Sequence, residues 1–109
     1  MKNQIKLSFV AMAVAILAIF PGSLALGQAG ADTYKTKCQM CHSADGSGSS
    51  PAGKSMGAIP FNSPQLIKAS DADLIAATTH GKGKMPAYAG KLTDAQIKDV
   101  VAYIRTLQK

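Results

Sequence analysis

The stretch Cys38-Gln39-Met40-Cys41-His42 decides the fold, because it places two thiols one helical turn apart and an imidazole directly after the second. On a helical turn, two cysteines at this spacing can point the same way. Both thiols can then add to the two vinyl groups of a haem while the imidazole of His42 reaches the iron. The motif therefore predicts one haem c, attached covalently through Cys38 and Cys41, with His42 as an iron ligand.

Three other interpretations of this motif fit less well. A zinc site needs two more ligands, and the chain has no further cysteine, while His80 alone cannot complete the set. A thioredoxin-like redox pair belongs in an α/β fold, and the sequence shows no strand pattern. A structural disulfide would be tolerated in an exported protein, but it would leave His42 without a role.

The second iron ligand is predicted to be Met85, in the segment Gly81-Lys82-Gly83-Lys84-Met85-Pro86-Ala87-Tyr88. The two glycines allow tight wrapping, and the proline fixes the chain just after the thioether. Met40 lies inside the attachment motif, and Met56 fits better as a gap filler at the haem edge. His80 is the competing ligand on chemical grounds, but its place at a predicted helix end favours a solvated side chain.

Residues 1–27 have the pattern of a secretory signal peptide. Two lysines precede an apolar block from Leu7 to Phe20, which is shorter than the roughly 20 residues that cross a bilayer as a helix. Small residues before Gln28 predict cleavage there, with cleavage after Ala29 or Ala31 as alternatives. We therefore expect a bacterial periplasmic protein without stable membrane insertion, with one domain over residues 28–109. An uncleaved membrane anchor is the alternative.

Length and charge narrow the function classes. The 109 residues allow one domain, and two cysteines cannot form a multi-disulfide framework. Removing residues 1–27 takes away two lysines and no acidic residue, so the formal charge falls from +6 to +4. The sequence has no dense basic run with interleaved aromatic residues, which argues against nucleic-acid binding. A modest basic excess fits an acidic protein partner better.

Helix caps are clear in the second half of the chain. Thr93 and Gln96 have the capping-box pattern and precede apolar residues at helical spacing, so we predict a helix from Asp94 to Gln108. Ser70 is expected to cap another helix, which Gly81 would end. Both elements support an all-α domain.

The rest of the mature chain is expected to consist of helices and a loop. Short helices are expected from Pro64 to Ala69 and from about Ala31 into the cysteine pair. Residues 43–62 are rich in glycine, proline and serine and are expected to form a loop. The mature chain is small for a self-sufficient hydrophobic core, so a non-protein group is expected to complete it.

With the attachment motif, the segment around Met85 and an amphipathic last helix, the chain resembles the class I monohaem c-type cytochromes of small bacterial type. The resemblance covers the whole mature chain and implies a small cytochrome c fold. Its amino- and carboxyl-terminal helices would cross, with Gly30 and Tyr34 against Val100 and Tyr103. Related proteins also present a backbone carbonyl at the position of Pro51 to the haem-ligating imidazole.

The combined interpretation is a one-electron carrier between redox proteins and not an enzyme. With both axial positions filled, the iron has no free site for a substrate. The haem c would lie against an apolar wall, for which the candidates are Ile59, Phe61, Leu66, Ile67, Leu74, Ile75 and Tyr88.

Partner docking and oligomeric state are expectations as well. We expect a monomer whose basic side chains ring the haem edge and attract acidic surfaces of redox partners. The candidates are Lys35, Lys37, Lys54, Lys82, Lys84 and Lys91, and a scattered solvated surface is the alternative. Two other functions remain open: a haem subunit of a larger oxidoreductase, and a haem peroxidase or ligand sensor with a displaceable Met85.

Overall fold

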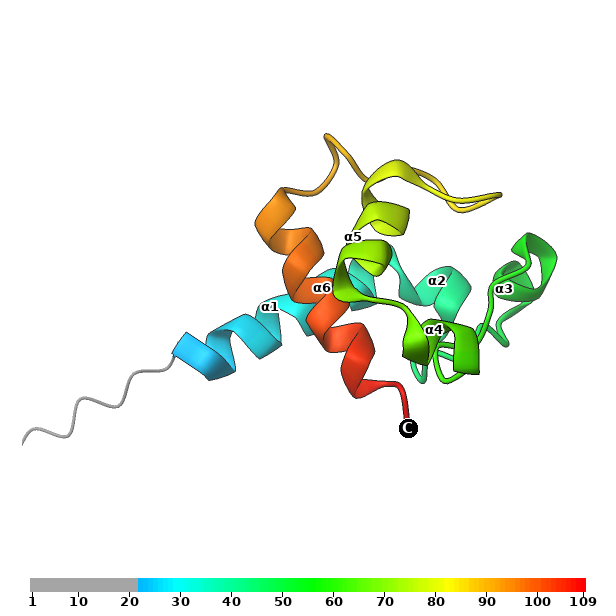
Figure 1. Ribbon diagram of the computed structural model, residues 1–109, viewed down its shortest axis with the longest axis horizontal. Helices are drawn as coiled ribbons and strands as arrows, with labels where there is room; N and C mark the ends of the chain where they lie inside the picture. Colours follow the sequence, from blue (N-terminus) through cyan, green and yellow to red (C-terminus); the bar gives the residue numbers. More distant parts are fainter. Residues whose placement is uncertain (1–21) are drawn as a thin grey trace, which may run out of the picture.

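The computed structural model describes residues 22–109, and over this range the chain is helical (Figure 1). The elements are α1 (Gly22–Lys37), α2 (Gln39–His42), α3 (Pro51–Met56), α4 (Pro64–Lys68), α5 (Asp71–His80) and α6 (Asp94–Thr106). Within these residues there is no strand, only the isolated bridges Lys82–Met85 and Ala89–Leu92. The all-α prediction is confirmed.

The amino-terminal prediction lies mostly outside the described residues. The apolar block of the expected signal peptide falls in residues 1–21, and cleavage before Gln28 stays a prediction. α1 begins at Gly22, earlier than the expected start near Ala31. None of the described helices is long and apolar enough to cross a membrane.

Both predicted helix caps are present, and each forms a capping box. In α6 the Thr93 side chain accepts from the Gln96 N–H at 3.1 Å, and the Gln96 side chain accepts from the Thr93 N–H at 2.8 Å. Ser70 and Asp73 make the same reciprocal pair at the start of α5, which ends before Gly81 at φ +77°. Each box satisfies two donors that a helix start would otherwise leave unpaired. α6 ends at Thr106, two residues earlier than predicted.

The expectation that residues 43–62 form only a loop is wrong, because α3 lies within them. Ser50 caps α3 by accepting from the Gly53 N–H at 3.0 Å, and Pro51 occupies the first helical position. Gly57, at φ +73°, ends the helix in the left-handed conformation. This serine-proline start also precedes α4 at Ser63, but the surrounding glycines obscured it at residue 50.

The crossing of α1 and α6 organises the rest of the fold (Figure 1). Gly30 lies so close to α6 that a Cβ there would overlap the carbonyl oxygen of Asp99 and lie 3.3 Å from the Cβ of Tyr103. One turn later, the ring of Tyr34 packs on that of Tyr103, with centroids 5.2 Å apart. The predicted contact of Gly30 and Tyr34 with the last helix is therefore present.

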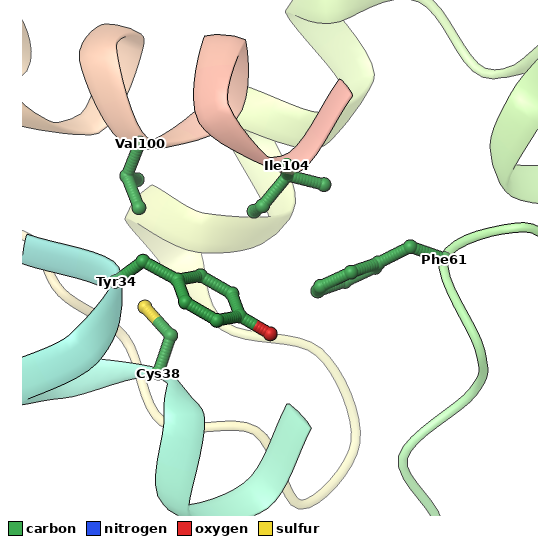
Figure 2. Packing of buried hydrophobic residues seen from close by; sticks show 5 residues of the cluster. All are labelled: Tyr34, Cys38, Phe61, Val100 and Ile104. Atoms are coloured by element: carbon green, nitrogen blue, oxygen red, sulfur yellow. The ribbon is translucent and has the colours of Figure 1, made fainter. Parts of the chain in front are cut away.

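A small apolar cluster continues from this crossing towards the cysteine motif. Figure 2 shows Tyr34 of α1 beside Val100 and Ile104 of α6, with Cys38 next to it and Phe61 reaching in from the loop before α4. Tyr34 and Val100 are almost fully buried. The Tyr34 hydroxyl donates to the Ser43 carbonyl, so a buried phenol is satisfied within the cluster.

Arg105 of α6 holds the turn between α4 and α5 against α6. Its guanidinium donates to the carbonyls of Leu66, at 3.2 Å, and Ala69, at 2.6 Å, and pairs with Asp71 at 2.9 Å. Carbonyls at the end of α4 lack intrahelical partners, and Arg105 supplies donors to this region. The Asp71 carboxylate is well exposed, so the carbonyl bonds contribute more than the ion pair.

The close crossing gives a first prediction. Alanine normally stabilises a helix relative to glycine, but at residue 30 its Cβ must push α1 away from α6. We expect Gly30→Ala to destabilise the protein by about 1–3 kcal/mol, the range for overpacking, as measured by thermal unfolding. Lys35→Ala, on the exposed part of α1, is the control and should leave the midpoint nearly unchanged. A Gly30→Ala protein as stable as the parent would contradict the close approach.

Candidate haem-binding site

One large cavity of about 980 Å³ brings the cysteine motif and the Met85 segment together. Cys38, Cys41 and His42 line it, and so do residues of α4, α5 and the loop 81–88. Its size is at the upper end of the range of about 300–1,000 Å³ for ligand and cofactor sites. The cavity therefore has room for a large planar group beside the motif.

The cysteine motif continues directly from α1. The Cys38 N–H donates to the Tyr34 carbonyl at 2.9 Å, and the His42 N–H donates to the Cys38 carbonyl at 2.9 Å. α1 thus ends just before Cys38, and the short helix α2 follows at once, which holds the three reactive side chains on one short turn. Neither Cys38 nor Cys41 forms a disulfide, so both thiols are available. Burial, and then the neighbouring Cys41, raise the pKa of the Cys38 thiol to about 11.

His42 has the properties of a metal ligand. Burial lowers the pKa of its imidazole, which favours the neutral form with a free lone pair. The ring stacks on Phe61, with centroids 4.6 Å apart and an angle of 21° between the planes. Its Nδ1 is buried and has no hydrogen-bond partner within residues 22–109.

Pro51 does not supply the expected hydrogen bond to His42. Pro51 is the first residue of α3, is exposed and does not line the cavity. Within residues 22–109, Nδ1 of His42 thus has no hydrogen-bond partner, whereas the resemblance implied a bond donated by Nδ1 to the Pro51 carbonyl.

α3 instead contacts the motif through Gly53. This residue is buried, and a Cβ on it would overlap the Cys41 carbonyl oxygen and lie 2.5 Å from that of Gly48. The Ser50 hydroxyl also donates to the Met40 carbonyl at 2.7 Å. α3 therefore covers the backbone of residues 38–42, the attachment turn, and no sequence pattern indicated this role.

Met85 lies in a tight loop and is half-buried at the cavity. The Met85 N–H donates to the Lys82 carbonyl at 3.0 Å, and the Lys82 N–H donates to the Met85 carbonyl at 3.2 Å. Gly81 and Gly83 have φ of +77° and +58°, as the wrapping of this loop requires. His80 is exposed at the end of α5 and also lines the cavity.

Most of the expected apolar wall is present. Of the sequence candidates, the cavity is lined by Ile59, Phe61, Leu66, Leu74 and Tyr88. Ile67 and Ile75 do not line it, and Ile67 is exposed. Ile104 is an additional lining residue; its helical spacing in α6 had indicated only core packing.

The charged residues at the cavity are mainly basic. Of the six lysines considered for docking, Lys37, Lys82 and Lys84 line the cavity and are exposed, whereas Lys35, Lys54 and Lys91 do not line it. Asp73 is the one acidic residue among the described lining residues. The potential at the mouth is therefore positive on balance.

Comparisons with known proteins agree with this site. A family model described as cytochrome C oxidase, cbb3-type, subunit III matches residues 25–104. Cytochrome c6 of Thermosynechococcus vestitus is 37% identical over 90% of this chain and 87% of its own. The cbb3-type cytochrome c oxidase subunit CcoP of Azospirillum brasilense is 33% identical over 76% of this chain, but over only 29% of its own length. The solved KustC0563 c-type cytochrome superposes with a TM-score of 0.67 over 73% of this chain and 98% of that chain, at 29% identity.

Fold and site together define a small haem protein of the electron-transport class, a class I monohaem c-type cytochrome. The chain belongs to the cytochrome c family represented by the cbb3-type subunit III model. The two free thiols, the neutral imidazole and the apolar cavity fit haem c by their chemistry.

Proposed function

We propose that this protein is a one-electron carrier in which Cys38 and Cys41 hold haem c covalently and His42 and Met85 are the axial ligands. The observation that carries the proposal is the convergence of these four residues on one apolar cavity. Haem c supplies a one-electron ferric–ferrous couple when bound, and a thioether ligand favours the ferrous form. The surrounding side chains exclude water, which keeps the change of charge weakly solvated.

The location and partners belong to the same proposal. The apolar residues 7–20 and the small residues before Gln28 support export to the periplasm, where the thiols would be modified. The carrier would act as a monomer between redox proteins. Lys37, Lys82 and Lys84 would face acidic surfaces of those partners, because they line the cavity and are exposed to solvent.

The similarity to CcoP supports a second candidate function. Because this chain matches less than a third of that oxidase subunit, the match covers one portion of a larger protein. The protein would then pass electrons as a bound subunit of an oxidoreductase. Size-exclusion chromatography of the protein purified from its native membrane and periplasmic fractions separates the two functions, since only a subunit elutes with a larger complex.

Covalent attachment gives a prediction with a direct mass readout. After expression with a haem-attachment apparatus and acid–acetone extraction, the intact protein should retain the mass of one haem. The double variant Cys38→Ser, Cys41→Ser should retain none, because no thiol remains to form a thioether. Met40→Leu, between the two cysteines and 79% exposed, is the matched control and should keep the haem. Bare polypeptide in the parent protein would refute the proposal.

Ligation by Met85 gives a spectroscopic prediction. The ferric protein should show the weak near-infrared band of sulfur-to-iron charge transfer at neutral pH. Met85→Ala should abolish this band completely, because the thioether is removed. Met56→Ala, which alters another methionine of the cavity, should retain it. A band that survives in Met85→Ala would assign the sulfur ligand elsewhere, and its absence from the parent protein would favour a ligand such as His80.

The basic cavity mouth gives a kinetic prediction. The measured quantity is the rate at which an oxidant takes an electron from the ferrous protein at low ionic strength. Two oxidants of opposite charge are compared: ferricyanide, which is an anion, and tris(phenanthroline)cobalt, which is a cation. The double variant Lys82→Gln, Lys84→Gln should react roughly tenfold more slowly with the anion and faster with the cation, because it loses two positive charges at the mouth. The difference should shrink as salt is added. The control is the double variant Lys68→Gln, Lys98→Gln, which removes two exposed lysines that do not line the cavity. An equal effect in this control would exclude local steering.

A further inference from the structure

Tyr88 joins two segments that contribute different parts of the site. Its hydroxyl donates to the Lys37 carbonyl oxygen at 2.9 Å, across 51 positions of sequence. Lys37 is the last residue of α1 and immediately precedes Cys38. Tyr88 follows Met85 by three positions in the loop 81–88. A single side chain therefore connects the loop of the proposed sulfur ligand to the helix that leads into the attachment turn.

The chemistry of both groups favours this bond. A carbonyl at the carboxyl end of a helix lacks an intrahelical donor, so the Lys37 oxygen is an available acceptor. The Tyr88 phenol is protonated at neutral pH and can donate, and burial raises its pKa further above the ordinary value. The ring lines the cavity, and the Lys91 ammonium lies 5.7 Å from its centroid. These ring contacts do not need the hydroxyl.

The other hydrogen bonds of this loop lead elsewhere. The Tyr88 N–H donates to the Thr78 carbonyl and the Ala89 N–H to the Thr79 carbonyl, both at 3.0 Å, which attaches the end of the loop to α5. The Lys82–Met85 pair closes the loop on itself. Within residues 22–109, the Tyr88 hydroxyl makes the only hydrogen bond between the loop 81–88 and α1.

We propose that Tyr88 is a positioning residue whose hydroxyl holds the Met85 loop against the end of α1 and so resists displacement of Met85 by other ligands. This role rests on the proposed ligation by Met85. Without the hydroxyl, the loop remains attached to α5 but can move away from the attachment turn. The fraction of molecules with Met85 displaced then rises, and an external ligand binds more tightly in proportion.

The test is the binding of imidazole to the ferric holoprotein, followed by loss of the near-infrared band. Tyr88→Phe removes one hydroxyl and keeps the ring, so the apparent Kd for imidazole should fall two- to fivefold, as expected for one partly exposed hydrogen bond. Tyr103→Phe is the matched control. Its ring also packs in the domain, against Tyr34, but its hydroxyl has no hydrogen-bond partner within the described residues. The Kd of this control should equal that of the parent.

The outcomes separate this role from the proposed function. An unchanged Kd in Tyr88→Phe overturns the role of the hydroxyl while leaving Met85 ligation intact. An equal fall in Tyr103→Phe also overturns it, because the effect would then be a general loosening of the domain. If the parent protein lacks the near-infrared band, Met85 ligation itself fails, and the inference fails with it before any variant is compared.

Discussion

The close approach of α1 and α6 at Gly30 is the constraint on which the other features depend. Because only a hydrogen faces the Asp99 carbonyl, the two helix backbones come nearer than any side chain would permit. α1 leads without interruption into Cys38, whereas α6 carries Ile104 to the cavity and Arg105 to the turn before α5. The distance between these helices therefore fixes the attachment turn relative to the opposite parts of the cavity wall.

The cavity also explains how so short a chain can have a defined core. The buried cluster around Tyr34 and Phe61 is small, and a domain of this size buries only a modest share of its apolar surface. Side chains such as Leu66 and Leu74 are only half-buried and line the cavity. A prosthetic group bound there would complete their burial, so cofactor binding and folding stability are coupled in this architecture.

The sequence predicted those features that local patterns encode. The helix caps at Ser70 and Thr93 follow from residue type and spacing. The contact of Gly30 with the last helix came instead from the resemblance to the cytochrome family, because no local pattern relates residues 30 and 99. α3 was missed because glycines around Ser50 reduce helix propensity, whereas tertiary packing against the attachment turn stabilises it. The Tyr88 hydrogen bond to Lys37 could not be predicted, since no local pattern relates residues so far apart. The role of Ile104 was hidden for a similar reason: an apolar helix position does not reveal which neighbour it contacts.

Gly53 shows that a site can be constrained by a residue that does not line it. The carbonyl of Cys41 occupies the space that any side chain at this position would need. Natural variation of α3 should therefore be confined to its outward positions, with residue 53 intolerant of replacement. A homologue carrying a larger residue there would need a compensating change in the peptide geometry around its second cysteine.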